Sequence, residues 1–352
     1  MKIGILTFHN ADSYGAVLQA YALQQTITKL GAEAEFVQID VPKKQQPEAN
    51  QASSAAASLF ARRIQAEGQK REALFADFRN NYMNISKPYQ PTDQIDGDYD
   101  SFIAGSDQIW NFRIPGADAR YFLPFASADK RHSYAASFGA DALPEQAKQW
   151  ASKQLSLFRS ISVREASGTQ IVEELTGRVA EVCLDPTLLP DRADWEALAP
   201  VNQNGDYVFL FMLKYDEQLL KTAQAQAAEL NIPLKIVSAA FMPQLGIPAW
   251  NTTGVIEWLS LIRNARCVFT NSFHGMVFSM IYGRSFRIQR LGGELSSRNG
   301  RLEEMLSQLG LSEAFDALVT PDYQKIWKQL EEKKASSLEY LRRIAQNDSV
   351  DF

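Results

Sequence analysis

Short apolar runs alternate with stretches of helical periodicity along the first half of the chain. Apolar runs of strand length are found at residues 2–8, 35–39, 102–105, 132–137 and 161–164. After the first run, apolar residues recur at helical spacing from Val17 to Leu23, which predicts a helix, and Gly31 is expected to end it. An exposed connector rich in Gln, Lys, Pro and Ala is predicted at 42–54, followed by a long charged helix at 55–80. This βαβα order predicts a parallel sheet covered by helices on both faces.

The pattern starts again near Pro190. Strands are predicted at 207–213, 234–237, 267–270 and 286–288, and helices at 217–230, 253–264 and 322–343. We expect the last helix to pack back on the first domain. The fold class that follows is α/β, with two Rossmann-like domains, residues 1–190 and 191–352, that face a cleft. Ligands in such folds bind at the carboxyl ends of the strands, so the loops there are the candidates for chemistry.

Composition and charge narrow the class of protein. Hydrophobic residues make up 45% of the chain and charged residues 22%, which is ordinary for a soluble globular protein. The net charge of −5 leaves no excess of cations to neutralise a phosphate backbone, which argues against a nucleic-acid partner. Cys183 and Cys267 lie in apolar segments, as expected of buried thiols in a cytosolic protein. The first apolar run is too short for a signal peptide, and no run is long enough to span a bilayer. We expect a cytoplasmic protein that is also able to work at the inner face of the membrane.

The segment at residues 270–275, Thr-Asn-Ser-Phe-His-Gly, is the most informative part of the chain. It follows an apolar strand and precedes a helix, predicted over about 276–282. That arrangement leaves backbone N–H groups and the positive end of the helix dipole free to bind a phosphate or carboxylate. His274, one of three histidines, adds a proton donor suited to a phosphate-releasing transfer reaction. The alternative is that Ser272 caps a buried helix and His274 is a satisfied core residue.

A second strand-end loop concentrates small, polar and aromatic residues. Residues 105–111 read Gly-Ser-Asp-Gln-Ile-Trp-Asn. The small residues, Ser106 among them, allow close backbone approach to a ligand, while Asp107 and Asn111 are able to bind sugar hydroxyls. The alternative is an Asx-type turn with Trp110 packed beneath it.

The next strand ends carry further candidates. Residues 133–139 have small side chains, including Ser137, which suits either backbone approach to a ligand or tight packing of a helix. Arg164 ends an apolar strand, and a substrate carboxylate or phosphate would give it a bidentate partner. The competing interpretation is an internal ion pair with Glu165 or Asp185. Asp185 precedes a proline and is held extended, which suits an interdomain turn as well as a catalytic carboxylate.

The common cofactor motifs are missing from the sequence. It contains no GxGxxG, P-loop, HExxH or CxxC motif, so it lacks the motifs that usually indicate nicotinamide, ATP and zinc sites. We therefore expect no cofactor and no metal.

Together, these motifs resemble the polysaccharide pyruvyl transferase family. The segments that carry the resemblance, in order and spacing, are 106–111, 133–139, 161–165 (Ile-Ser-Val-Arg-Glu), 184–187 (Leu-Asp-Pro-Thr) and 271–275. Residues 14–23 resemble the family's opening helix, and 296–298 (Ser-Ser-Arg) with the following helix resemble its late motif. One departure is Ser13, where many members carry asparagine. The resemblance covers about residues 1–310.

The resemblance implies both a fold and a reaction. Members of the family resemble two-domain glycosyltransferases of the GT-B type, so a GT-B-like fold is expected. They move the pyruvyl group of phosphoenolpyruvate onto two hydroxyls of one sugar residue, in surface or capsular polysaccharide biosynthesis. The products are a cyclic ketal and phosphate. The expected partners are phosphoenolpyruvate and a sugar acceptor, with a lipid-linked oligosaccharide acceptor and peripheral membrane association left open.

The resemblance also implies roles for particular residues. His274 would be the acid or phosphate contact, and Arg164 the clamp for the donor carboxylate. The helix that begins near Phe273 would cradle the phosphate, while Asp107 and Asn111 would face the acceptor sugar. The expected substrate-binding residues are Ser106, Asp107, Asn111, Ser137, Asp185, Asn271, Ser272, Phe273 and Arg298.

Two other functions stay open at this point. The first is a GT-B glycosyltransferase that uses a nucleotide sugar, because it would share the cleft, the helix N-terminus and a histidine. The second is a non-catalytic binding member of the same fold.

Overall fold

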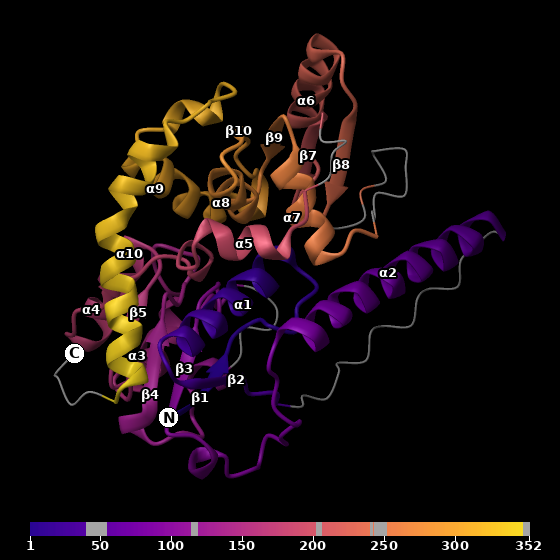
Figure 1. Cartoon of the computed structure of the whole chain (residues 1–352). Helices are drawn as coiled ribbons and strands as arrows, with labels where there is room; N and C mark the ends of the chain where they lie inside the picture. The colour runs from indigo at the N-terminus through magenta and orange to yellow at the C-terminus, as the bar shows by residue number, and fades with distance from the viewer. Residues whose placement is uncertain (40–54, 114–118, 202–205, 240–241, 243–251, 348–352) are drawn as a thin grey trace.

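The computed structural model describes residues 1–39, 55–113, 119–201, 206–239, 242 and 252–347. The connector predicted at 42–54 lies outside the described residues. Within the described ranges, no helix is long and apolar enough to cross a membrane. Two α/β halves follow one another along the chain, and the C-terminal helix runs beside both (Figure 1).

The first half is built on a parallel sheet in the order β2-β1-β3-β4. Its strands are β1 (Lys2–Leu6), β2 (Glu33–Phe36), β3 (Ser101–Gly105) and β4 (Arg131–Tyr134). Parallel bridges from His132 to Ser160 and from Ala136 to Val163 continue the order into β5 (Ser162–Val163), which pairs with β6 (Glu181–Val182). The βαβα order therefore predicts the parallel pairing correctly, because strands joined by helical crossovers run in the same direction.

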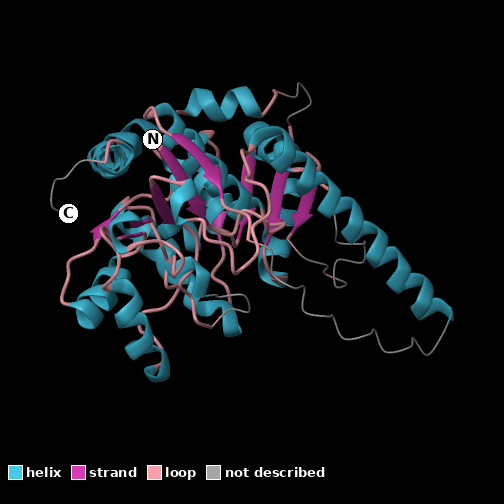
Figure 2. Ribbon diagram, turned by 90° about the horizontal axis from the view of Figure 1, so that it is seen from below, coloured by secondary structure: helices cyan, strands magenta, loops and turns pink. Residues whose placement is uncertain are grey.

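Helices lie on both sides of the strands (Figure 2). In the first half they are α1 (Tyr14–Lys29), α2 (Ala55–Tyr82), α3 (Glu145–Leu155) and α4 (Ala166–Thr176). Most of α1 is buried, since it contacts β2 in its own half and α8 (Phe273–Ile281) in the other. The helix ends before Gly31, whose φ of 93° lies in the left-handed region that glycine adopts at little cost.

The second half repeats the design with a parallel sheet in the order β10-β9-β7-β8. Its strands are β7 (Val208–Met212), β8 (Leu234–Ser238), β9 (Cys267–Thr270) and β10 (Ser285–Ile288). Its helices, besides α8, are α5 (Arg192–Leu198), α6 (Glu217–Leu230), α7 (Val255–Asn264) and α9 (Gly300–Gln308). The expected pair of Rossmann-like sheets is thus confirmed, and the carboxyl ends of the strands meet where the halves face each other.

The last helix, α10 (Tyr323–Ala345), returns to the first half, as predicted. The Tyr340 hydroxyl donates to the Ser133 carbonyl at 2.9 Å, and the Ser337 hydroxyl accepts from the Leu184 N–H at 3.0 Å. Both contacts are buried and join α10 to backbone groups of the first half. The helix therefore fixes the second half against the first.

Apolar packing also joins the halves directly through Tyr14 at the start of α1. Its ring stacks on Trp258 of α7, with 4.9 Å between ring centroids, and its hydroxyl donates to the Thr253 carbonyl at 2.7 Å. An aromatic pair of this kind is worth about 0.5–1.5 kcal/mol beyond its buried area. The interface is therefore part of a continuous core that holds α1 in place beside the site described below.

From two buried histidines we predict how the stability of the folded protein depends on pH. Burial lowers the pKa of His9 to about 4 and that of His132 to about 3. In the unfolded chain both titrate near their ordinary pKa of about 6.5, so between pH 6.5 and 4 the unfolded chain binds more protons. The free energy of unfolding should have its full value above pH 6.5 and should decrease as the pH falls. By pH 4 the decrease should be on the order of 3 kcal/mol per histidine.

Urea denaturation of the protein between pH 7 and pH 4.5 measures this slope. The variant His132→Asn should show a shallower dependence, because one of the two groups no longer titrates. An equal slope in the variant and the unchanged protein would show that other groups cause the acid instability.

Candidate functional site

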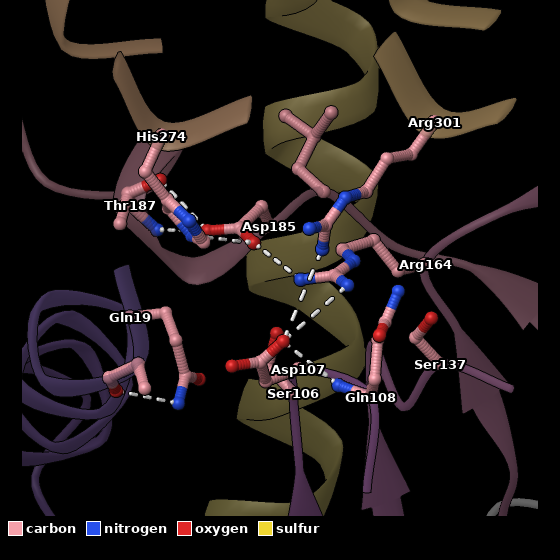
Figure 3. Close-up of polar contacts among 12 residues, drawn as sticks. Gln19, Ser106, Asp107, Gln108, Ser137, Arg164, Asp185, Thr187, His274 and Arg301 are labelled. Atoms are coloured by element: carbon pink, nitrogen blue, oxygen red, sulfur yellow. Dashed lines mark hydrogen bonds and ion pairs between the residues drawn. The ribbon is translucent and has the colours of Figure 1, made fainter. Parts of the chain in front are cut away.

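Charged side chains from both halves converge at the carboxyl ends of the strands (Figure 3). From the first half come Asp107, which follows β3, Arg164, which follows β5, and Asp185, which precedes a short 3-10 turn. From the second half come His274 in α8 and Arg301 in α9. The site is thus built between the halves, where ligands of doubly wound folds bind.

Arg164 lies at the centre of an ion-pair network. Its Nη1 is 2.9 Å from Asp185 Oδ2, and its Nε is 3.1 Å from Glu165 Oε1. Its Nη2 is 3.8 Å from Asp107 Oδ1 and makes no hydrogen bond. Burial acts to lower the pKa of Arg164, but the three carboxylates outweigh it and raise the pKa above its ordinary value. The internal ion pair is therefore found with both carboxylates named from the sequence, and Arg164 is not a lone cation.

Asp185 is an ionised carboxylate at the base of the site. Its side chain is fully buried, and its Oδ1 accepts from the Thr187 hydroxyl at 2.7 Å and from the Thr187 N–H at 3.0 Å. Burial acts to raise the pKa of Asp185, but His274, Arg164 and the Thr187 hydroxyl together hold it well below its usual range. This carboxylate is therefore placed to orient the Arg164 guanidinium and the His274 imidazole beside it.

His274 stands next to Asp185 without a hydrogen bond of its own at Nε2. That nitrogen lies 3.4 Å from Asp185 Oδ2, and it is buried. The edge of the ring faces Phe273, at 5.3 Å between centroids. Buried polar atoms are nearly always hydrogen-bonded, so an orphan imidazole nitrogen here indicates a place for a ligand or a transferred proton.

Gly15 of α1 leaves the space that the His274 ring occupies. A Cβ built at Gly15 would lie 2.1 Å from His274 Nδ1, closer than atoms can approach. The variant Gly15→Ala should therefore displace the imidazole and reduce turnover by at least about 10²-fold, since displacement of about 1 Å costs that much.

Turnover and melting temperature of Gly15→Ala, beside those of Gly97→Ala, measure this effect. A Cβ at Gly97 meets nothing within 4 Å, so this control should behave like the unchanged protein. Normal turnover in Gly15→Ala would show that the position of His274 is not critical.

The start of α8 combines a helix cap with the histidine. Ser272 is the N-cap, and its Oγ accepts from the Gly275 N–H at 3.2 Å. The capping alternative is therefore confirmed for Ser272. The other half of that alternative is a core histidine; the His274 side chain is buried, and its Nε2 lies 3.4 Å from Asp185 Oδ2 without a hydrogen bond. Phe273 lies beneath the guanidinium groups of Arg164 and Arg301, whose Cζ atoms are 5.7 and 5.0 Å from its ring centre.

The loop after β3 carries backbone strain. Ser106 and Asp107 have φ values of 26° and 65°, which residues other than glycine seldom adopt. Asp107 Oδ1 accepts from the Gln108 N–H at 2.8 Å, while the Ser106 hydroxyl is buried without a hydrogen-bond partner. Strain of this kind gathers at functional sites, and here it presents Asp107 to the two arginines.

Three of the expected binding residues have side chains that hydrogen-bond within the protein. The Asn111 side chain bonds to Gln108 and to the Arg113 N–H, and Trp110 is buried beneath the loop, as in the turn alternative. The other two residues are Ser137 and Asn271. Ser137 Oγ donates to Glu165 at 2.9 Å, and the Asn271 side chain hydrogen-bonds to the backbone of Leu213 and Lys214. The side chain of Arg298, also expected here, lies outside the described residues.

The structure adds two residues that the sequence analysis does not identify. Gln19, one helical turn after Gly15, donates from Nε2 to Thr7 Oγ1 at 3.0 Å and leaves its Oε1 unbonded. Arg301 follows the Ser-Ser-Arg motif by three residues, and its Nε and Nη1 have no hydrogen-bond partner. The signal in the sequence is that an arginine follows Arg298 by three residues, and it does not show that Arg301 turns toward the site.

A small cavity adjoins Arg164 and Arg301, and neither Asp107 nor His274 is among its walls. It has a volume of about 230 Å³. Its walls include Arg164, Asp185, Phe273, Arg301 and Lys333. Cavities that bind drug-sized molecules usually exceed about 300 Å³, so this one suits a small ligand. No group of three or more His, Cys, Asp or Glu side chains that would hold a metal is found in the described part of the chain.

Comparison with solved structures gives distant similarities over nearly the whole chain. A UDP-GlcNAc 2-epimerase from Methanocaldococcus jannaschii is 12% identical, with a TM-score of 0.45, over 99% of this chain and 100% of that one. A putative UDP-N-acetylglucosamine 2-epimerase from Listeria monocytogenes is 9% identical, with a TM-score of 0.44, over 98% and 90%. Spinosyn rhamnosyltransferase SpnG is 10% identical, with a TM-score of 0.39, over 99% and 96%. Similarity at this level says nothing about the activity of this chain.

Comparison with family models gives a specific result. Curated protein sequences give no significant match. In contrast, the model of the polysaccharide pyruvyl transferase family matches residues 14–288. This range is most of the chain, and it includes the opening helix, the Arg164 strand end and the His274 segment. The chain therefore belongs to the polysaccharide pyruvyl transferase family.

Proposed function

We propose that this protein moves the pyruvyl group of phosphoenolpyruvate onto two hydroxyls of one sugar residue, with release of phosphate, in the biosynthesis of a surface or capsular polysaccharide. The observation that carries the proposal is a buried cluster in which Asp185 contacts both His274 and Arg164. Beside it lie guanidinium nitrogens of Arg164 and Arg301 that make no hydrogen bond. Such a site offers a proton donor next to positive charge, which the chemistry of an enol phosphate requires.

The reaction needs one proton donation and two additions of oxygen. The enol methylene of the donor accepts a proton and becomes a methyl group, and the first sugar hydroxyl adds to the neighbouring carbon. The carbon–oxygen bond to phosphate then breaks, and the second hydroxyl adds to the same carbon. Each hydroxyl gives up one proton, so the products are the ketal carboxylate and hydrogen phosphate.

The side chains of the site divide these tasks in our proposal. His274 donates the proton to the methylene or neutralises the departing phosphate, while the ionised Asp185, 3.4 Å from Nε2, orients its ring. Arg164 contacts the donor carboxylate through Nη2, which is the one nitrogen of its guanidinium that makes no hydrogen bond. The acceptor sugar would approach Ser106 and Asp107, whose loop has unusual backbone angles.

The cellular location follows from the donor. Phosphoenolpyruvate is an intracellular metabolite, so we propose that the protein works in the cytoplasm, associated peripherally with the inner face of the membrane when the acceptor is lipid-linked. The sugar itself is free or lipid-linked in this proposal.

Activity is expected to survive chelation, because arginine side chains and backbone N–H groups are able to stabilise the leaving phosphate. Turnover with phosphoenolpyruvate before and after treatment with EDTA measures this. Complete loss of turnover, restored by one divalent ion, would overturn the metal-free mechanism.

A donor panel separates the proposed reaction from nucleotide-sugar chemistry. The protein is incubated with one oligosaccharide acceptor and either phosphoenolpyruvate or a set of nucleotide sugars, and released phosphate and nucleotide are measured. Phosphate release that depends on both phosphoenolpyruvate and the acceptor is the expected result. Nucleotide release from a nucleotide sugar, with no turnover of phosphoenolpyruvate, would assign the protein to the glycosyltransferases.

A further inference from the structure

Arg301 is a buried cation whose hydrogen-bonding capacity is largely unused. Its side chain is 11% exposed, and its Nε and Nη1 are buried without a hydrogen-bond partner. Within the described part of the chain, the carboxylate paired with it is Asp107, at 3.9 Å from Nη1. That distance is too long for a hydrogen bond. A buried guanidinium normally forms short bonds to an anion, so the usual partner of Arg301 is missing.

The electrostatic environment of Arg301 is unfavourable. Burial and, after it, the nearby charge of Arg164 lower its pKa to about 10, although the charges of Asp107, Glu165 and Asp185 act in the opposite direction. Both guanidiniums approach the same Phe273 ring and the same Asp107 oxygen. Arg164 is balanced by two further carboxylates, Glu165 and Asp185, at hydrogen-bond distance. Arg301 therefore carries the cationic charge of this site that is least compensated by its neighbours.

Asp107 lies close enough to balance the charge of both arginines but accepts no hydrogen bond from either of them. Its Oδ1 lies 3.8 Å from Arg164 Nη2 and 3.9 Å from Arg301 Nη1, while it accepts the Gln108 N–H at 2.8 Å. Its left-handed backbone, with φ of 65°, holds it in this intermediate position. An anion bound by both guanidiniums would find free N–H groups on each of them, and both arginines line the cavity of about 230 Å³.

We propose that Arg301 binds an anionic oxygen group of the donor, a phosphate or a carboxylate, together with Nη2 of Arg164. Assignment of this anion to the donor rests on the proposed function, whereas the anion site itself does not. Asp107 is the internal counterion that balances Arg301 when the site is empty of ligand. The planar fork of the guanidinium matches the two oxygens of such a group, which a lysine at this position would not do.

Calorimetric titration of the full chain tests the proposal with three probes: phosphoenolpyruvate, inorganic phosphate and pyruvate. Arg301→Gln should weaken binding of phosphoenolpyruvate by about 10–100-fold, the usual effect of lost charge-assisted hydrogen bonds. Arg301→Lys should be intermediate, because it keeps the charge and loses the fork. The matched control is Arg290→Gln, since Arg290 is half-exposed, pairs with Glu303 and lies outside the cavity walls; its affinities should equal those of the unchanged protein.

The separate probes identify which group of the donor binds. Weaker binding of phosphate but not pyruvate in Arg301→Gln assigns the phosphate to Arg301, and the reverse result assigns the carboxylate. Equal affinity of Arg301→Gln and the unchanged protein for phosphoenolpyruvate would overturn the proposal. So would failure of the unchanged protein to bind any of the three probes. Binding that depends on Arg301, without any ketal product, would preserve the anion site and reject the proposed function.

A stability measurement distinguishes a binding role from a structural one. Arg301→Met removes a buried charge with unmet donors beside Arg164, so its melting temperature should rise by about 2 °C while anion binding falls. Residues that serve function at a cost to stability behave in this way. A melting temperature several degrees lower in Arg301→Met would show that the guanidinium holds the fold together, and it would contradict the proposal.

Discussion

Replacement of His274 by alanine is expected to reduce kcat with phosphoenolpyruvate by about 10²–10⁴-fold, the usual contribution of a general acid. The imidazole is placed for this by α8, by the space at Gly15 and by the ionised Asp185, 3.4 Å from Nε2. The fold should survive, because Asp185 keeps its contacts with Arg164 and Thr187 and the His274 Nε2 makes no hydrogen bond that would be lost.

His274→Gln separates proton transfer from anion binding. Glutamine keeps a hydrogen-bond donor but cannot act as an acid, so an equally low kcat with unchanged donor affinity would assign proton transfer to His274. Turnover and melting temperature are measured for both variants. Near-normal turnover in His274→Ala would reject the catalytic role, and loss of folding without a specific effect on rate would restore the interpretation as a core histidine.

Replacement of Arg164 by methionine should lower the free energy of unfolding by about 3–5 kcal/mol, the usual cost of removing one partner from a buried ionic network. The loss is large because Asp185, Glu165 and Asp107 would keep their charges in a buried site without the guanidinium between them. Activity should be lost as well. Arg164→Lys keeps the charge but not the fork, so it should preserve more stability while the apparent KM for the donor rises markedly.

Urea denaturation and donor titration of both variants measure these effects. Arg290→Met is the control, since the pair of Arg290 and Glu303 is about half-exposed and such pairs contribute at most about 1 kcal/mol. Stability of Arg164→Met within 1 kcal/mol of the unchanged protein would mean that the network is not a structural unit. An unchanged donor KM in Arg164→Lys would remove Arg164 from the binding site.

Elements with strong local signals could be predicted from the sequence. The helix predicted at 217–230 coincides with α6, because Asp216 caps its start by accepting from the Leu219 N–H and Asn231 ends it with a φ of 53°. The strand at 267–270 coincides with β9. In contrast, β6 was not predicted. It has two residues and pairs with β5, and its Val182 is 46% exposed, so tertiary pairing and not a local apolar pattern forms it.

The candidate site divides in the same way. The ion pairs of Arg164 could be anticipated, because Glu165 is its neighbour in sequence and Asp185 lies in the Leu-Asp-Pro-Thr segment that closes the first half. The use of Asn271 could not, since its amide bonds to Leu213 and Lys214 arise only when β9 lies beside β7. Arg301 was missed for the same reason: it reaches the site because α9 places it above Phe273, and no local pattern reports that packing.

The reaction carried out in D₂O with phosphoenolpyruvate and an oligosaccharide acceptor tests the central claim most directly. Mass spectrometry and NMR of the product should show a pyruvyl ketal whose methyl group carries one deuterium, because the enol methylene receives its proton from an exchangeable acid. Phosphate should be released in an amount equal to the ketal, and both should be lost in His274→Ala. A ketal methyl without deuterium, or an acceptor that gains no pyruvyl group, would contradict the account.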